Sequence, residues 1–330
     1  MAARTRYAPD RGLTVRMTAT LFLLGLVFVA FVALIIGIMT AAHASGAAII
    51  LVAVIFGGGS AFISLFFSDK IALAAAGAQV VTPQQAPELH GIVDRLCALA
   101  DMPKPRVAIS PARMPNAFAT GRNSEHAVLC VTEGLLYHSG LTQEELEGVL
   151  AHELSHVAHK DVQVMTYASL LAIVAGLLVR FAFYSELFGG RRSNDGNAAL
   201  LIPLIMLASA VVYAISFLLI RVLSRYRELA ADRSGALLTQ NPSALISALT
   251  KVSQGMNRIP TQDLRAAEPL NAFYFAPAMK MNLSGRRGGG GGASLSTLFS
   301  THPSLDKRIE QLSKIQRELG QVGSDPRGLQ

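Results

Sequence analysis

The feature that most constrains this chain is a long segment without charge. From Met17 to Ser68 the sequence contains no Asp, Glu, Lys or Arg. Since a helix needs about 20 apolar residues to cross a bilayer core, this segment is long enough for two membrane spans. We place them at about residues 18–39 and 47–67, with residues 40–46 as the turn between them.

Two further apolar runs follow, at about residues 162–184 and 198–220. The chain is 51% hydrophobic and only 15% charged, whereas charged residues make up about a quarter of a typical soluble domain. A cleaved signal peptide is the alternative for the first run, but that run is longer than the roughly 7–15 apolar residues of such signals. These patterns predict a four-helix integral membrane protein, mainly α in class.

Basic residues near the span ends predict the orientation. Arginines precede the first span and follow the fourth, so we expect both termini on the cytoplasmic side. Arg191 and Arg192, in the turn expected outside, oppose this mildly. The net charge of +7 fits an anionic inner leaflet, and no interleaving of aromatic and basic residues indicates a nucleic-acid partner.

The chain outside the spans forms two expected parts, residues 68–161 and 221–330. Helical periodicity and short β-prone runs between Pro and Gly predict helices and a small sheet. The expected helices cover residues 84–100, 142–160, 221–239, 242–252 and 303–319, and the expected strands cover residues 106–110, 116–120 and 127–131. Residues 257–300, which include the glycine run Gly288–Gly292, predict a mobile loop.

An H-E-x-x-H motif occupies residues 152–156, in a helix that a Thr-x-x-Glu capping box opens at residue 142. Residues four apart on a helix share a face, so His152 and His156 can offer two imidazole nitrogens to one zinc ion. Glu153 is close enough to accept a proton from water. Because about one chain in a hundred of this length carries the three fixed residues by chance, the motif needs support from the rest of the chain.

A zinc hydrolase usually provides three protein ligands. A third histidine continuing the motif is excluded, because Val162 stands at its position. Glu228 is the best candidate, since it follows the fourth span on the same expected membrane side, and Asp232, one turn further, suits a carboxylate that holds a ligand histidine in its tautomer. The alternatives are that both acids are ordinary surface charges of a helix, or that His159 is the third ligand.

These features together resemble the HtpX family of membrane zinc metallopeptidases, relatives of the CAAX prenyl endopeptidase. The segments that carry the resemblance are residues 116–121, the motif at 152–156 with Asp161, residues 224–232 with Glu228 and Asp232, and Thr301-His302-Pro303. Their order and their interleaving with two hydrophobic pairs also match. The expected fold is therefore a four-helix membrane protein with a small α+β, zincin-type peptidase domain at the membrane surface.

The resemblance implies one zinc ion per subunit, with His152, His156 and Glu228 as ligands and Glu153 as general base. It implies an endopeptidase in the bacterial inner membrane, with its active site toward the cytoplasm. The implied substrates are misfolded or damaged membrane proteins and unfolded polypeptides, cleaved in a stress response that maintains protein quality.

Two further sites are implied with open alternatives. Asn116, Ala117, Phe118 and Ala119 resemble a strand beside the cleft, to which an extended substrate can add; the alternative is an ordinary edge strand with Phe118 in the core. His302 resembles a residue that donates to the developing oxyanion; the alternative is a residue that only precedes a helix start at Pro303.

Three other classes are less favoured. An intramembrane protease would carry the motif inside an apolar span, whereas Glu144, Glu147 and Lys160 flank it here. A non-catalytic zinc adaptor would often lack the glutamate of the motif, and Glu153 is present. A transporter finds little support in spans with almost no internal charge.

Overall fold

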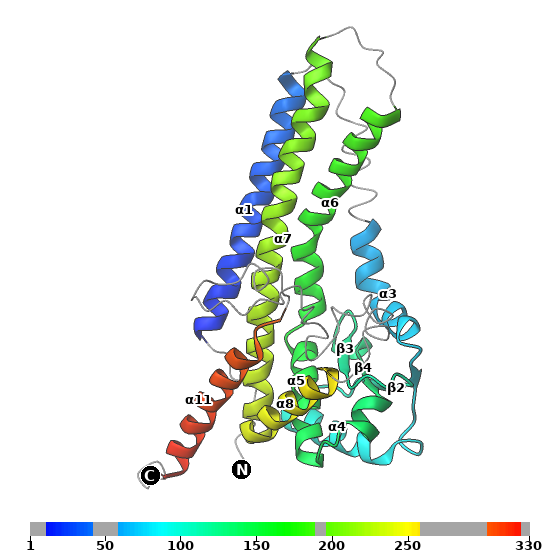
Figure 1. The fold of residues 1–330 in the computed structure, drawn as a ribbon, viewed down its shortest axis with the longest axis vertical. Coiled ribbons are helices and arrows are strands. Elements are labelled where there is room, and N and C mark those ends of the chain that lie inside the picture. The colour runs from blue at the N-terminus through cyan, green and yellow to red at the C-terminus, as the bar shows by residue number, and fades with distance from the viewer. Residues whose placement is uncertain (1–10, 42–58, 189–195, 258–301, 325–330) are drawn as a thin grey trace. The chain divides into compact units, whose positions relative to one another are not determined.

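The computed structural model describes residues 11–41, 59–188, 196–257 and 302–324 (Figure 1). The chain forms two compact units. One combines residues 14–66 with 163–224, and the other combines residues 1–13, 67–162 and 225–330. The domain boundaries expected from the sequence stay a prediction, as does the mobile loop at 257–300, nearly all of which lies outside the described residues.

The first unit contains long apolar helices. Among the described residues, three segments are long and apolar enough to cross a membrane: Arg11–Leu34 of α1 (Arg11–Ala41), Asp161–Arg180 of α6 (Asp161–Phe188) and Pro203–Thr239 of α7 (Gly196–Thr239). The three helices pack through Phe31, Ala175 and Val212. The structure confirms apolar helices at the first, third and fourth expected spans. The second expected span lies mostly outside the described residues, and α3 (Gly59–Ala75) covers its end.

The second unit is built on a four-stranded sheet of order β1-β2-β4-β3. The strands are β1 (Gln79–Val80), β2 (Arg106–Ser110), β3 (Ala117–Thr120) and β4 (Val128–Thr132). β2 and β4 are parallel, and the other two pairs are antiparallel. The three expected strands are confirmed to within one residue, whereas the two-residue β1 was too short to predict. β3 lies at an edge of the sheet, with β4 as its neighbour.

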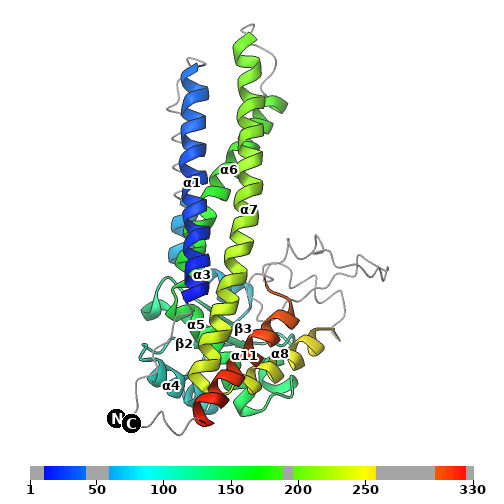
Figure 2. The same ribbon diagram turned by 90° about the vertical axis from the view of Figure 1, so that its left-hand side faces the viewer.

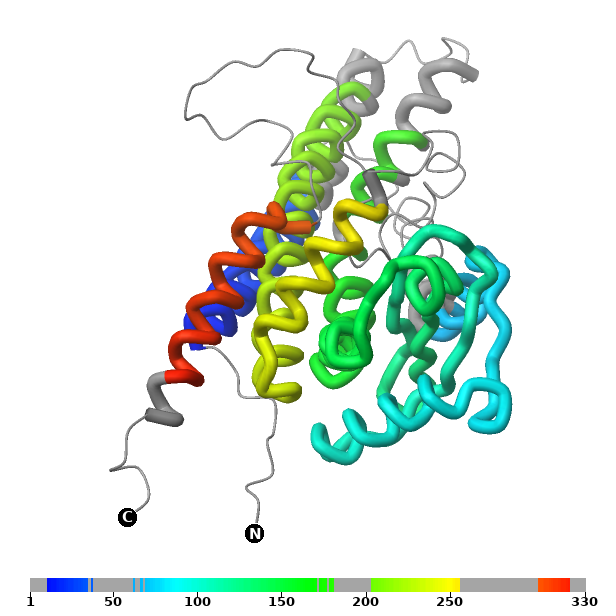
Figure 3. Tube along the Cα trace, turned by 60° about the horizontal axis from the view of Figure 1, so that its bottom comes forward, coloured from blue at the N-terminus to red at the C-terminus, as the bar shows by residue number. Residues whose placement is uncertain are grey.

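The two faces of the sheet pack against different helices, because side chains alternate along a strand. Phe118 and Cys130 meet Ala72 of α3, whereas Ala117 and Val131 join the main core. Four further helices build that core: α4 (Pro87–Ala100), α5 (Gln143–Ala158), α8 (Pro242–Asn257) and α11 (Leu305–Ser324). Single helical turns at Ser124–His126 and Gly134–His138 flank β4. In Figures 2 and 3, α11 runs beside α8, and Leu245, Leu249, Leu312 and Ile315 are buried between them and their neighbours.

The helix α5 has a well-defined start. The Thr142 hydroxyl accepts from the Glu145 amide, and the Glu145 carboxylate accepts from the Thr142 amide, which confirms the predicted capping box. Glu145 also accepts from Lys251 at 2.7 Å and from Ser247 at 2.5 Å, both on α8. The first turn of α5 is therefore fixed to a second helix, which leaves its last turns to form the site.

Candidate metal centre

Three side chains from two helices converge at one point in the second unit. His152 and His156, on α5, and Glu228, on α7, each offer one ligand atom, and these atoms all lie within 4.8 Å of one another. The two Nε2 atoms are 3.2 Å apart. Glu228 Oε2 lies 3.7 Å from His152 Nε2, and Glu228 Oε1 lies 3.6 Å from His156 Nε2.

This donor set fits a zinc ion. Tetrahedral ligands at about 2.0–2.1 Å from zinc lie about 3.3 Å from one another, close to the separations observed. Two imidazoles and one carboxylate are also the ligand types of catalytic zinc sites. His152 is completely buried; burial lowers its pKa, but Asp232 and Glu228 outweigh burial and raise the pKa to about 9. The surroundings thus favour a positive charge at this point.

His152 has a support built from two distant helices. Its Nδ1 lies 2.9 Å from Asp232 Oδ1, on α7. Arg308, on α11, grips the same carboxylate with two hydrogen bonds, from Nε to Oδ2 at 2.7 Å and from Nη2 to Oδ1 at 2.6 Å. We call His152, Asp232 and Arg308 the His152 arm. A carboxylate on the far nitrogen fixes the ring and the tautomer, so Nε2 faces the metal position.

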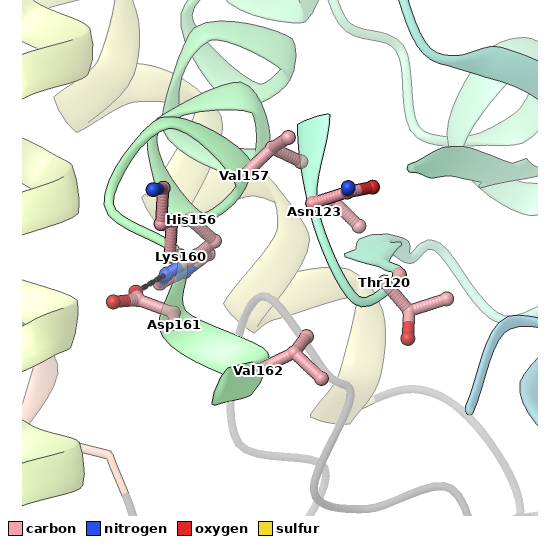
Figure 4. A pocket seen from close by; sticks show the side chains of 9 residues that line it. Thr120, Asn123, His156, Val157, Lys160, Asp161 and Val162 are labelled. Carbon is pink, nitrogen blue, oxygen red and sulfur yellow. Dashed lines mark hydrogen bonds and ion pairs between the residues drawn. The ribbon is translucent and has the colours of Figure 1, made fainter. Parts of the chain in front are cut away.

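His156 has a parallel support of more local origin. Its Nδ1 donates to Asp161 Oδ2 at 2.6 Å, as Figure 4 shows, and Arg227 Nη2 lies 2.8 Å from the same oxygen. Lys160 adopts a left-handed backbone with φ of 56°, which ends α5 and lets α6 begin at Asp161. This short break between the two helices places Asp161 beside a histidine only five positions earlier. We call His156, Asp161 and Arg227 the His156 arm.

A glycine allows α7 to approach α5 closely. A Cβ atom on Gly235 would lie 2.9 Å from the His152 backbone nitrogen and 3.2 Å from its Cα. Gly235 is one turn from Asp232, so this contact sets the distance across which Asp232 reaches His152. Nothing in the sequence singles out Gly235, because a glycine inside a helix has several explanations.

The other predicted catalytic residues also lie at this centre. Glu153 is buried, and burial raises its pKa, which suits a group that must accept a proton. His302 is buried before α11, with its Nδ1 3.1 Å from Glu228 Oε2. His159, weighed as an alternative ligand, is not part of the group of three; burial lowers its pKa.

The predicted substrate strand lies at the edge of the sheet. Asn116, Ala117 and Phe118 have buried side chains, and Phe118 packs in the core as the simpler alternative expected. A small cavity of about 10 Å³, near the size of one water molecule, separates the end of β3 from α5. Figure 4 shows Thr120 on one side of this cavity and His156 and Val157 on the other.

Sequence reasoning missed three residues of the arms. Arg227 is one of the arginines after the fourth span, which indicate only the membrane orientation, and Asp161 enters only through the family resemblance. The spacing of Asp161 from His156, directly after the helix, was a usable signal. No signal in the sequence pointed to Arg308, because 76 positions separate it from Asp232.

A His-His-Glu cluster on two helices, in which His152 and Glu228 are buried and each histidine has a carboxylate behind it, defines a metallopeptidase-type centre. Comparisons with known proteins agree. Residues 83–316 match the model of "Peptidase family M48". A "Protease HtpX homolog 1" of Streptomyces coelicolor is 56% identical over 97% of this chain and 98% of that protein, and a "Protease HtpX homolog" of Moorella thermoacetica is 46% identical over 96% and 98%. The crystal structure of S. mikatae Ste24p shares the fold, with a TM-score of 0.54 and 16% identity over 92% of this chain and 67% of that one.

The chain belongs to peptidase family M48 and is similar to its HtpX proteases. It is a metalloprotease, and its apolar helices mark it as a membrane protein.

Proposed function

We propose that the protein is a membrane-bound zinc endopeptidase, with one zinc ion held by His152, His156 and Glu228. The observation that carries this proposal is the convergence of the three ligand atoms within 4.8 Å, with both histidines oriented by carboxylates. Nitrogen and carboxylate donors on two helices favour zinc over magnesium or calcium, which prefer all-oxygen sites.

Each residue of the centre has its own part in the proposed reaction. When bound, zinc would act as a Lewis acid and lower the pKa of a water molecule. Glu153 accepts the proton from water and delivers it to the amine that leaves. Asp232 and Asp161 keep the two imidazoles oriented. His302, beside Glu228, is suited to hold that carboxylate through Nδ1 and to donate from Nε2 to the developing oxyanion.

An extended substrate is proposed to add to β3. The amide of Thr132 donates to the carbonyl of Asn116, so these residues form a hydrogen-bonded antiparallel pair. Such pairs alternate, and β3 pairs Ala117 with Val131 and Ala119 with Leu129. The N–H and C=O groups of Ala117 and Ala119 therefore face away from β4, toward the open edge. The proposed contact with substrate is through this backbone rather than through side chains.

Two hollows, one near each end of β3, support this proposed path of the substrate. The small cavity lies at its Thr120 end, beside His156. A larger hollow of about 420 Å³ lies before its Asn116 end, lined by Arg113, Pro115 and Lys251. A polypeptide laid along β3 would run from one to the other.

We further propose that the protein lies in the bacterial cell membrane, which is the inner membrane in cells that have two membranes. Its active site would face the cytoplasm. There it would cleave misfolded or damaged membrane proteins. The arginines outside the first and fourth spans support this orientation. Protease digestion of sealed inside-out vesicles tests it: a tag at the C-terminus is expected to be removed without detergent. Protection of that tag would contradict the orientation.

The direct test of the activity is Glu153→Gln in the purified protein. This variant is expected to retain one zinc ion and to lose cleavage of an unfolded polypeptide, because only the proton acceptor is removed. Glu144→Gln, exposed on the same helix, is the matched control and keeps full activity. Cleavage by Glu153→Gln at the wild-type rate would show that another residue is the base.

A further inference from the structure

One short segment of the C-terminal part touches both α7 carboxylates of the centre. His302 lies 3.1 Å from Glu228 Oε2, and Arg308 holds both oxygens of Asp232. Glu228 and Asp232 are one turn apart on α7. Residues 302–308 therefore lie along the turn of α7 that serves the metal position.

Arg308 is placed where its charge and its shape both matter. Its side chain is 1% exposed, and that of Asp232 is 0% exposed, so the pair is shielded from bulk solvent. A guanidinium that binds a carboxylate through two parallel bonds fixes the carboxylate plane as well as its charge. With that plane fixed, Oδ1 of Asp232 points at His152 Nδ1. Burial lowers the pKa of Arg308, but the charges of Asp232, Glu228 and Glu153 outweigh burial and raise it.

The packing of α11 delivers this side chain. Leu312 and Ile315 are buried in the core, and Gln311 donates to the Leu229 carbonyl of α7 at 3.0 Å. Ser304 accepts at the start of the helix from the Arg308 and Lys307 amides. The apolar face of α11 and its first turn thus fix the same end of the helix that carries Arg308.

We propose that Arg308 is a positioning residue for the metal, and that docking of α11 sets zinc affinity through the plane of the Asp232 carboxylate. This inference rests on the proposed zinc site. It makes the C-terminal helix, which has no ligand of its own, a determinant of metal binding. Loss of the Arg308 fork would let Asp232 rotate and leave His152 free to turn its Nε2 away from the ion.

The test is the zinc dissociation constant of the purified full chain, measured by competition with a chromophoric chelator. Arg308→Met is expected to weaken zinc binding about tenfold or more, within the range for residues behind a ligand histidine. Arg308→Lys keeps the charge without the fork and should fall between wild type and Arg308→Met. Arg317→Met, an exposed arginine on the same helix, is the control and should bind zinc as the wild type does.

A double-mutant cycle separates positioning from general destabilisation. In an Asp232→Asn background, Arg308→Met should cause little further loss of affinity, because its effect passes through the carboxylate. The double variant also removes both buried charges, so it is expected to fold even where Arg308→Met alone does not. Equal losses in both backgrounds, or wild-type affinity in Arg308→Met, would overturn the inference. A wild-type protein that binds no zinc would instead overturn the proposed site.

Discussion

The two histidines of the centre are supported in the same chemical way but from different parts of the chain. Each Nδ1 meets an aspartate, and each aspartate meets an arginine. In the His156 arm, the aspartate follows the histidine by five positions, across the break between α5 and α6. In the His152 arm, the three residues come from α5, α7 and α11, and Asp232 and Arg308 are 76 positions apart.

The difference separates what a helix end can arrange from what tertiary packing must arrange. The His156 arm needs the end of α5 and one arginine of α7. The His152 arm needs the close contact of α7 with α5 at Gly235 and the docking of α11. Its arginine is also more deeply buried, 1% exposed against 11% for the Arg227 side chain. The His152 arm should therefore be the more sensitive to substitution.

The largest effect is expected at Glu228, the residue both arms face. Glu228→Ala removes one of the three proposed ligands, so the purified variant should lose stoichiometric zinc. Metal analysis after dialysis measures this, with His159→Ala as a control that should keep its zinc. If Glu228→Ala still holds one zinc ion per chain, the third ligand lies elsewhere and the two arms do not share it.

The next largest effects are expected at the aspartates of the two arms. Asp232→Asn and Asp161→Asn should each weaken zinc binding by about 10- to 100-fold, because each histidine ring then loses the charged carboxylate behind it. Asp232→Asn should also lower the free energy of unfolding more, by about 3 kcal/mol, because it leaves Arg308 buried without a counter-charge. Chelator competition and thermal melting in detergent measure the two quantities. Equal destabilisation by both variants would remove the distinction between the arms.

A smaller effect is expected at Gly235, which acts on the His152 arm alone. Gly235→Ala places a Cβ 2.9 Å from backbone of α5, so α7 must shift, at a cost of about 1–3 kcal/mol in stability and with weaker zinc binding. Gly91→Ala, in α4 with no atom within 4 Å of its Cβ, should instead stabilise the helix by about 1 kcal/mol. The melting temperatures of the two variants measure this difference in stability. An equally stabilised Gly235→Ala would show that this contact does not hold the helices in register.

The smallest effect lies at the other end of α5, at Glu145. Burial opposes its ionisation, but hydrogen bonds from Lys251, Ser247 and the Thr142 amide outweigh burial and lower its pKa. The folded state therefore gains stability from Glu145 at pH above its ordinary pKa of about 4.5, and loses it as the pH falls through the lower folded-state value. Glu145→Gln should destabilise the protein by about 1 kcal/mol at pH 7, with a smaller difference from wild type in acid.

The control for Glu145 is Glu144→Gln, which changes an exposed carboxylate on the same turn. It should leave the melting temperature nearly unchanged at both pH values. A destabilisation of Glu145→Gln that is independent of pH would assign the effect to packing rather than to the ionised carboxylate.

The sequence predicted those parts of the molecule that depend on neighbours along the chain. The apolar helices, the capping box at Thr142 and the three main strands follow from local periodicity and turn residues, and the structure contains them. The shared helix face of His152 and His156 follows from helix geometry alone. Glu228 required a match between the order of the spans and the membrane side, together with a resemblance to a known family.

The remaining parts depend on contacts between distant segments. Gly235 and Arg308 are ordinary residues of helices until α5, α7 and α11 are brought together. The burial of Arg308 could not be predicted, since arginine is usually exposed and nothing near it in the sequence marks a partner. The edge position of β3, which the resemblance led us to expect, likewise depends on the order of the strands rather than on residues near β3 in the sequence.

The central claim is that one zinc ion is bound jointly by α5 and α7. Anomalous diffraction from crystals of the purified protein, collected above and below the zinc absorption edge, tests it most directly. One peak is expected within about 2.0–2.2 Å of His152 Nε2, His156 Nε2 and a carboxylate oxygen of Glu228. A zinc peak at any other place in the chain, or none at these three residues in an active preparation, would contradict it.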